Sequence, residues 1–275
     1  MNQSTAQASD QPSSAKPLLA LKGVSKSFGP VEALKEVDLE LRGGEVIGLV
    51  GDNGAGKSTL IKAIAGVQPA DDGEAYFDGH RVTLTTPQAA TRLGIATVYQ
   101  DLALCENLDV VENLYLGKEV GDGIPGVHLL DESAMEQRTL ELLDSLGVTT
   151  ITSVRTEVAQ LSGGQRQAVA IARSLLGEPR LVLLDEPTAA LGIVQTREIL
   201  KLIARLRERG LGVVVISHNL ANVFEVADRI LVLRLGRLAA SLDATTASRE
   251  GVVAAITGAE FGETPAERST EEQPL

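Results

Sequence analysis

Hydrophobic positions early in the chain follow the two-residue period of β-strands. Residues 18–41 alternate apolar and polar side chains, most regularly over 37–41, and this alternation is typical of half-buried strands. Residues 76–82 predict a hairpin, because the pair Asp78-Gly79 readily takes the positive φ angles of a type I′ turn. We therefore expect an antiparallel β lobe here.

Other apolar runs are continuous, and segments with helical spacing follow them. Four such runs predict strands, at residues 46–50, 95–99, 181–184 and 211–217. One helical pattern stops at Gly66 and a later one at Gly210, and glycine commonly caps the C-terminal end of a helix. The pattern predicts an α/β fold with a mostly parallel sheet.

The middle of the chain has a different pattern. Residues 101–165 are patterned mainly as helix, most clearly over 110–116 and 134–146, and we expect a helical subdomain there. Near the end, residues 230–240 predict a closing hairpin, followed by a terminal helix near 251–256.

Both ends of the chain are poor in apolar residues. Residues 1–16 are rich in Ser, Gln and Ala and residues 262–275 in Glu, Thr and Pro, so we expect disordered tails around one domain over 17–261. No stretch of the sequence has the apolar length that a membrane span requires, and the first residues lack the basic and apolar regions of an export signal. We expect a soluble chain that is not exported.

The charge balance limits the partners. With 37 acidic and 25 basic residues among 275, the formal net charge is −12, so we expect no large basic surface for a nucleic-acid backbone. Cys105 is the only cysteine, which leaves no internal disulfide and no cysteine metal cluster. We therefore predict no nucleic-acid partner.

The most specific chemistry of the chain lies in one glycine-rich turn, Gly51-Asp52-Asn53-Gly54-Ala55-Gly56-Lys57-Ser58-Thr59. The turn follows a predicted strand and opens a predicted helix, which is the context of a P-loop. Glycines let backbone N–H groups and the helix N-terminus approach a polyphosphate, and Lys57 is placed to meet the β- and γ-phosphates. The Ser58 hydroxyl is the expected Mg²⁺ ligand, and we expect Thr59 to help hold the α-phosphate.

A second predicted helix N-terminus also suits the binding of an anion. The segment Leu161-Ser162-Gly163-Gly164-Gln165 leads into a helix with apolar spacing. Ser162 is placed as the N-cap, and two glycines leave the helix end bare for an anion. A chain with one nucleotide site has no obvious use for two such ends.

Several polar side chains follow predicted strands. Asp185 and Glu186 come directly after an apolar strand, at the end where parallel sheets bind ligands. Asp185 suits Mg²⁺ binding through water, and Glu186 suits polarisation of an attacking water. Gln100 and His218 end two other strands. Phe28 alone would be read as core, but near a P-loop it becomes a candidate platform for stacking adenine.

The ordered set of motifs resembles the ATP-binding subunit of ABC transporters over roughly residues 18–259. The resemblance implies an α/β P-loop NTPase fold that binds ATP and Mg²⁺. It implies that two subunits pack head to tail, with each ATP between the P-loop of one and residues 162–165 of the other. Gln100 would sense Mg²⁺ and the γ-phosphate and contact the helical subdomain, which docks on membrane subunits. His218 would contact the γ-phosphate and the attacking water.

Three phrases resemble bacterial monosaccharide importers in particular, at residues 51–55, 98–104 and 112–117. They imply a peripheral subunit on the cytoplasmic face of the inner membrane, which drives sugar import through a separate permease. An extracytoplasmic sugar-binding protein would deliver the sugar to that permease. Many such subunits fuse two ATP-binding halves, whereas one set of motifs occurs here, so a homodimer is implied. Gly192 stands where the family generally has an aspartate that helps join the two sites, so we expect weaker coupling between them.

Two other functions would use the same P-loop. A soluble ABC-type ATPase acting on DNA or the ribosome would usually carry a long coiled coil, zinc fingers or a tandem second cassette, and the sequence shows none of these. A small-molecule kinase would leave the helix end at residues 162–165 unexplained. An energy-coupling ATPase of a sugar importer is therefore the leading hypothesis.

Overall fold

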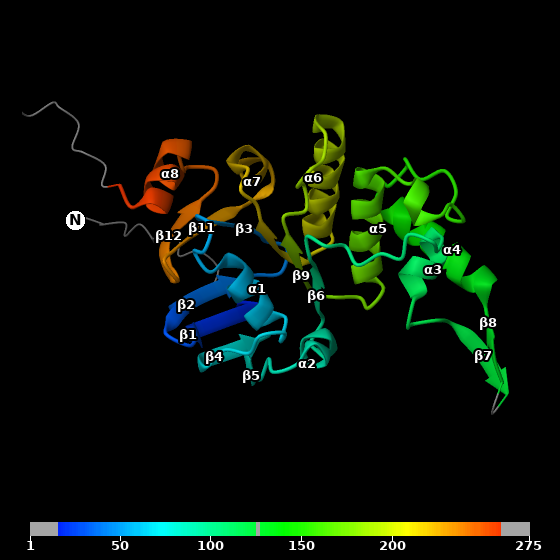
Figure 1. Cartoon of the computed structure of the whole chain (residues 1–275), viewed down its shortest axis with the longest axis horizontal. Helices are drawn as coiled ribbons and strands as arrows, with labels where there is room; N and C mark the ends of the chain where they lie inside the picture. Colours follow the sequence, from blue (N-terminus) through cyan, green and yellow to red (C-terminus); the bar gives the residue numbers. More distant parts are fainter. Residues whose placement is uncertain (1–15, 125–126, 260–275) are drawn as a thin grey trace, which may run out of the picture.

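A small antiparallel sheet forms one lobe of the protein, whose computed structural model describes residues 16–124 and 127–259 (Figure 1). The strand order is β2-β1-β4-β5, with bounds β1 (Leu19–Phe28), β2 (Val31–Leu41), β4 (Asp72–Phe77) and β5 (His80–Val82). Between β4 and β5, φ is 51° at Asp78 and 67° at Gly79, as the predicted turn requires. The predicted tails, apart from Lys16, lie outside the described residues.

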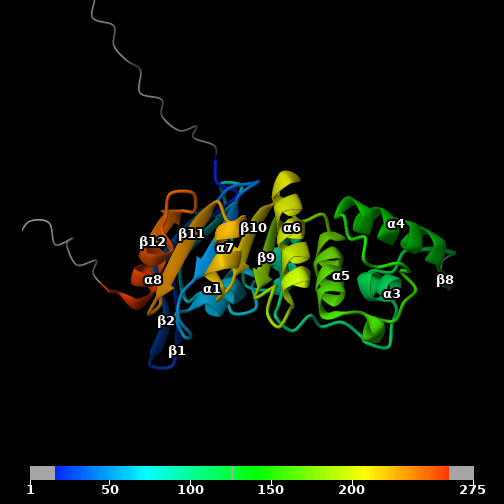
Figure 2. The same ribbon diagram turned by 90° about the horizontal axis from the view of Figure 1, so that it is seen from above.

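A six-stranded sheet forms the centre of the molecule (Figures 1 and 2). In the order β12-β11-β3-β10-β9-β6, its strands are β12 (Arg237–Asp243), β11 (Arg229–Arg234), β3 (Val46–Val50), β10 (Gly212–Ile216), β9 (Leu181–Asp185) and β6 (Ile95–Val98). The strands from β11 to β6 are parallel, and β12 pairs with β11 as the predicted antiparallel hairpin. The expected mostly parallel sheet is confirmed.

Helices connect these strands and cover the larger sheet (Figures 1 and 2). They are α1 (Lys57–Ile64), α2 (Pro87–Arg92), α3 (Val110–Tyr115), α4 (Glu132–Ser145), α5 (Gly163–Leu175), α6 (Ile193–Glu208), α7 (Leu220–Val226) and α8 (Arg249–Thr257), with a 3-10 turn at Val158–Gln160. Gly66 and Gly210 follow helix ends as predicted, with φ of 70° and 82°. The short helices α2 and α7 were not predicted. Among the described residues, no helix combines the length and apolar character that crossing a bilayer requires.

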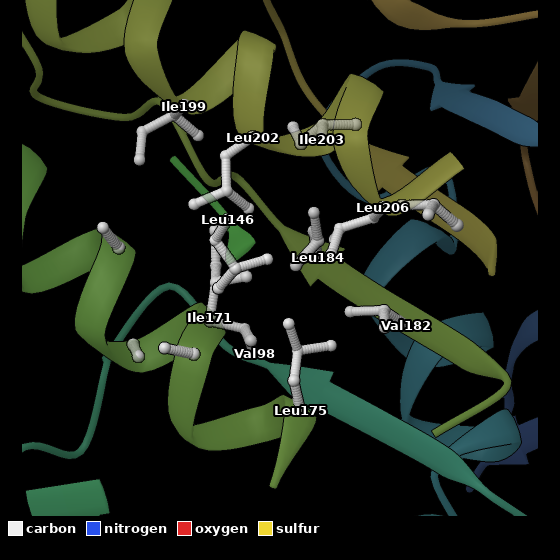
Figure 3. Packing of buried hydrophobic residues seen from close by; sticks show 14 of the residues in the cluster. Val98, Leu146, Ile171, Leu175, Val182, Leu184, Ile199, Leu202, Ile203 and Leu206 are labelled. Carbon is white, nitrogen blue, oxygen red and sulfur yellow. The ribbon is translucent and has the colours of Figure 1, made fainter. Parts of the chain in front are cut away.

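Both faces of the central sheet are covered, which explains its continuous apolar strands. Successive side chains of a strand point to opposite faces. On β9, Val182 and Leu184 join a core with α5, α6 and α7, whereas Leu183 joins a second core with α1 and the antiparallel sheet. Figure 3 shows the first core, where Ile171 of α5 and Leu202 of α6 pack beside β6 and β9.

The segment between β6 and α5 contains the predicted helices and one hairpin that was not predicted. Helices α3 and α4 lie close to the predicted 110–116 and 134–146. Strands β7 (Gly121–Ile124) and β8 (Val127–Leu130) pair antiparallel and extend away from α3 and α4 in Figure 1. The sequence Pro125-Gly126 is a turn signal, but it lies between two segments with helical patterns, and helical periodicity alone does not show the hairpin.

Candidate active site

Four parallel strands of the central sheet end at one edge. Their order in space is β3, β10, β9 and β6. The predicted site residues follow these strands in the same order: the turn 51–56, His218, the pair Asp185-Glu186, and Gln100. Because the carboxyl ends of neighbouring parallel strands meet at one edge, the fold gathers residues that are far apart in the sequence.

The glycine-rich turn requires glycine at two of its positions. A Cβ atom at Gly51 would lie 2.1 Å from the carbonyl oxygen of Leu233, and one at Gly56 would lie 2.6 Å from that of Ala33. Both glycines also have positive φ, at 148° and 107°. The turn therefore packs against β11 and β2 through bare backbone, and the N-terminus of α1 opens directly behind it as an anion-binding end.

Lys57 begins α1 and folds back over this turn. Its Nζ donates hydrogen bonds to the carbonyl oxygens of Gly51 (2.7 Å) and Asp52 (2.9 Å). Burial lowers the pKa of Lys57, and the carboxylates of Glu186, Asp52 and Asp185 oppose that shift. A polyphosphate on the turn would offer this ammonium a charged partner in place of neutral carbonyls. The other predicted phosphate contacts lie beside it, with Asn53, Gly54 and Ser58 exposed, Thr59 half-buried and Ala55 buried.

Asp185 ends β9 in a half-buried position. Burial raises the pKa of Asp185, and Lys62 and Lys57 oppose the shift. A divalent cation would stabilise the ionised carboxylate. The described residues contain no cluster of three His, Cys, Asp or Glu side chains, so Mg²⁺ here would also need neutral oxygen ligands, phosphate and water. Ser58 and Gln100, both exposed at this edge, fit that mixed ligand set.

Glu186 is turned out of the line of its strand. Its φ is 51°, and its N–H donates a 3.0 Å hydrogen bond to the carbonyl oxygen of Ile216 on β10. A left-handed backbone at a non-glycine residue costs on the order of 1–3 kcal/mol. The side chain, 15 % exposed, makes a 2.8 Å contact from Oε2 to Nδ1 of His218, which is 75 % exposed. The carboxylate is therefore held at the edge by its contact with an exposed imidazole.

The second predicted anion-binding end has the predicted cap. Ser162 Oγ accepts a 3.3 Å hydrogen bond from the Gln165 N–H, while Gln165 Oε1 accepts a 2.8 Å bond from the Ser162 N–H. This capping box leaves the glycines of residues 163–164 at the start of α5. No hydrogen bond or ion pair of the described residues joins residues 162–165 to the turn 51–56, and both views place α5 beyond α6 from α1 (Figures 1 and 2). A single chain therefore does not bring residues 162–165 to the turn 51–56.

Phe28 ends β1 at the surface. It is 44 % exposed, and Nζ of Lys26 lies 5.6 Å from the centre of its ring. The exposure excludes the alternative that Phe28 is an ordinary core residue. Its role in stacking adenine stays a prediction.

Arg173 of α5 was not among the predicted residues. It is half-buried and donates hydrogen bonds to the carbonyl oxygens of Leu102 and Ala103, just after Gln100. Arg173 lies four residues after the buried Val169, on the same face of α5. This spacing does not distinguish Arg173 from its neighbours, because residues 167–172 are all buried, so the sequence carries no specific signal for it.

Comparison with known proteins gives close relatives. A family model described as ABC transporter matches residues 34–189. The chain is 44% identical over 246 residues to the fructose import ATP-binding protein FrcA of Rhizobium meliloti, covering 88% of this chain and 95% of that protein. It is 47% identical over 221 residues to the xylose/arabinose import ATP-binding protein XylG of Sulfolobus acidocaldarius, and the match covers 80% of this chain and 86% of that protein. The ribose import ATP-binding protein RbsA 1 of Rubrobacter xylanophilus is 42% identical, and the match covers 93% of this chain but 50% of that protein.

Solved structures show the same fold. MJ1267, an ATP-binding cassette of an ABC transporter in its ADP conformation, aligns with a TM-score of 0.75 and 26% identity, covering 88% of this chain and 96% of that one. The dimeric bacterial ABC transporter cassette MJ0796 aligns with a TM-score of 0.69 and 30% identity, covering 82% of this chain and 98% of that one. The family model spans the turn 51–56, Gln100, residues 162–165 and the pair Asp185-Glu186.

Proposed function

The chain belongs to the ABC transporter family as an ATP-binding, ATP-hydrolysing subunit, and from this premise we propose that it drives import of a monosaccharide through a separate membrane permease. The observation that carries the proposal is its similarity to the fructose and the xylose/arabinose import subunits over most of both chains. These relatives are import subunits, and nothing among them supports the alternative of an ATPase acting on DNA or the ribosome.

The proposed ATP site follows the edge of the central sheet. The triphosphate lies over the turn 51–56, where Lys57 exchanges its two backbone carbonyl partners for β- and γ-phosphate oxygens. Ser58, Asp185 and Gln100 would hold Mg²⁺, which neutralises charge on those phosphates. Phe28 would stack on the adenine.

In the proposed hydrolytic step, Glu186 accepts a hydrogen bond from the attacking water and takes up its proton. A positioned general base typically contributes about 10²–10⁴-fold in rate. Without nucleotide, the 2.8 Å contact with His218 holds the carboxylate in one direction. With ATP bound, the exposed imidazole would turn toward the γ-phosphate and leave the carboxylate to the attacking water. Lys57 would stabilise the charge that develops on the transferred phosphoryl group.

Two copies are proposed to complete each site. The start of α5, residues 162–165, offers bare N–H groups but makes no bond to the turn 51–56 of its own chain. A head-to-tail dimer would place this helix end against the γ-phosphate bound by the other copy. The dimeric cassette MJ0796, which is similar over 82% of this chain, supports an assembly of two.

The permease is proposed to dock in a cleft beside Gln100. This cleft of about 480 Å³ lies between β6, α5 and the end of α3, and Tyr99, Leu102, Leu116 and Lys118 are among its lining residues. Leu116 is 51% exposed, so an apolar contact is available to a partner. Such docking would hold the subunit peripherally on the cytoplasmic face of the membrane, with an extracytoplasmic sugar-binding protein on the other side.

A transport assay tests the proposal. An integral membrane protein that copurifies with the chain is reconstituted with it in proteoliposomes, with labelled fructose, xylose and ribose as probes. We expect ATP-dependent uptake of at least one sugar with the native chain and none with Glu186→Gln. Hydrolysis without uptake of any of the three, or hydrolysis stimulated by DNA or ribosomes instead, contradicts sugar import.

A further inference from the structure

Asp71 lies beside the end of β1 and bonds three consecutive residues of that strand. Its N–H donates a 2.9 Å hydrogen bond to the carbonyl oxygen of Ser25. Its Oδ1 accepts a 2.6 Å hydrogen bond from Nζ of Lys26, and its Oδ2 accepts a 2.7 Å bond from the Ser27 N–H. The next residue of the strand is Phe28, the predicted platform for adenine.

These bonds lie where the pairing of β1 with β4 stops. Ser25 is opposite Asp72, which is the first residue of β4. Among the described strands, residues 26–28 pair with β2 alone. Backbone groups on the open side of such a strand need other partners, and the Asp71 carboxylate is the partner of the Ser27 N–H. Asp71 therefore holds a strand end that the sheet holds from one side.

The same carboxylate places Lys26 against the Phe28 ring. The Lys26 side chain is 16% exposed, which is low for a lysine, and its Nζ lies over the ring, 5.6 Å from the centre. An ammonium within about 6 Å of an aromatic face is attracted by the ring electrons. The hydrogen bond from Lys26 lowers the pKa of Asp71, so the carboxylate stays ionised beside the ammonium. Lys26 thus covers part of the ring, and Phe28 keeps enough exposed surface for a ligand.

Asp71 also belongs to the segment that leaves the phosphate-binding helix. Helix α1 starts at the turn 51–56 and ends at Ile64, and Asp71 lies between this end and β4. The connection is closely packed, because a Cβ atom at Gly66 would lie 2.4 Å from the carbonyl oxygen of Thr86. Asp71 therefore ties the end of β1 to the segment that continues from the phosphate site.

We propose that Asp71 is a positioning residue for the base of the nucleotide, which holds Lys26 and the end of β1 and so fixes the Phe28 ring relative to the turn 51–56. The inference rests on the proposed function, in which Phe28 stacks on adenine. It adds that affinity for the base depends on a carboxylate outside the predicted contacts with ATP.

A comparison of ATP with tripolyphosphate tests this role, because tripolyphosphate has the phosphates and no base. Asp71→Ala removes both side-chain bonds, and an exposed ion pair contributes little to stability, so the variant should fold. We expect Asp71→Ala to lose affinity for ATP and to keep native affinity for tripolyphosphate. Both affinities are measured by isothermal titration calorimetry on the full chain with Mg²⁺.

Phe28→Ala and the double variant complete the test. We expect Phe28→Ala to lower ATP affinity by roughly 5- to 150-fold, the range of base–aromatic stacking, and Asp71→Ala to lower it by part of that factor. In the absence of the Phe28 ring, Asp71→Ala should cause no further loss, because two residues that act through one contact are not additive.

Three results overturn the positioning role: native ATP affinity in Asp71→Ala, an equal loss of affinity for ATP and tripolyphosphate, or additive losses in the double variant. An unchanged preference for ATP over tripolyphosphate in Phe28→Ala counts instead against stacking in the proposed function, and the positioning role falls with it.

Asp38→Ala is the matched control. Asp38 Oδ1 accepts a 2.7 Å hydrogen bond from the Gly23 N–H, so Asp38 is another carboxylate that bonds the backbone of β1, away from the end of the strand. We expect Asp38→Ala to keep native affinity for both ligands. Loss of ATP affinity in both aspartate variants would show a general loosening of β1 and would count against a specific role for Asp71.

Discussion

Glu186 and His218 make a 2.8 Å contact between Oε2 and Nδ1, although they are 32 positions apart in the sequence. They meet because β9 and β10 are parallel neighbours that end at the same edge, with Ile216 opposite Asp185 in the register. The contact makes the orientation of the Glu186 carboxylate depend on the position of the exposed His218 side chain. A change in either residue is therefore expected to alter both the base and its orientation.

The first prediction concerns Glu186→Gln. Glutamine keeps the size of the side chain but cannot accept the proton of the attacking water, so we expect hydrolysis to fall by about 10²–10⁴-fold. Loss of a negative charge near the γ-phosphate also reduces repulsion across the closed interface, so Mg·ATP should retain the dimer. Size-exclusion chromatography with Mg·ATP and a phosphate-release assay measure the two effects together.

Glu198→Gln is the control for this change, because Glu198 is an exposed carboxylate on α6 that pairs with Lys201. It should hydrolyse ATP at the native rate. Hydrolysis by Glu186→Gln at nearly the native rate would remove Glu186 from the catalytic residues and leave His218 as the candidate.

The second prediction concerns Lys57→Ala. Lys57 brings an ammonium to the turn, where it already bonds two carbonyl oxygens. Hydrogen bonds to charged groups contribute about 1.5–3 kcal/mol, so ATP affinity should fall by roughly 10- to 100-fold, and turnover should be lost. Equilibrium binding of labelled ATP is the measurement, with the exposed Lys201→Ala as the control. Native affinity together with native turnover would refute the P-loop assignment.

Much of the fold could be predicted because its signals are local. Continuous apolar runs predicted the strands of the parallel sheet, and Asp78-Gly79 predicted the tight turn that the positive φ angles confirm. The site residues follow strands, and parallel strands share one carboxyl edge, so their gathering could also be expected. No local signal specifies which strands are neighbours in the sheet. Glu186 meets His218 because β9 lies beside β10 in the order β3-β10-β9-β6.

Other features depend on contacts that periodicity does not describe. The hairpin β7–β8 lies between two helical patterns, so the average pattern concealed it. The hydrogen bonds from Arg173 to the carbonyl oxygens of Leu102 and Ala103 join residues 70 and 71 positions apart, and no local pattern predicts them. The roles of individual residues toward ATP and Mg²⁺ stay predictions.

The third prediction concerns Ser162→Arg. The bulky cation would block the γ-phosphate of the other copy from the start of α5, so nucleotide binding to a single subunit should persist and hydrolysis should be lost. The change also removes an N-cap, which typically costs about 1 kcal/mol of stability. Ser248→Arg is the matched control, because Ser248 caps α8 by accepting a 2.9 Å hydrogen bond from the Gly251 N–H.

We expect the two variants to lose similar stability in thermal unfolding, and only Ser162→Arg to lose hydrolysis. Unchanged hydrolysis in Ser162→Arg would refute the shared site. A mixture of Ser162→Arg with Lys57→Ala contains at most one intact composite site per dimer. Residual activity in that mixture would show that one site can turn over alone, and complete loss would show that it cannot.

The last prediction concerns Gly192, the N-cap of α6, which stands where the resemblance implies an aspartate. Its φ of −70° and ψ of 165° suit any residue, and a Cβ there would meet only Gln195 Oε1, at 3.7 Å. Aspartate is also a better N-cap than glycine, so Gly192→Asp should fold normally and gain a few tenths of a kcal/mol in stability. If the missing carboxylate is what weakens coupling between the two ATP sites, the substitution should raise the cooperativity of steady-state hydrolysis in ATP.

Gly192→Asn supplies the same cap without the charge and should leave cooperativity as it is. Equal cooperativity in the native chain and in Gly192→Asp would show that the coupling does not depend on this position, and the exposed Ile193 and Val194 that follow it would then be the next residues to test.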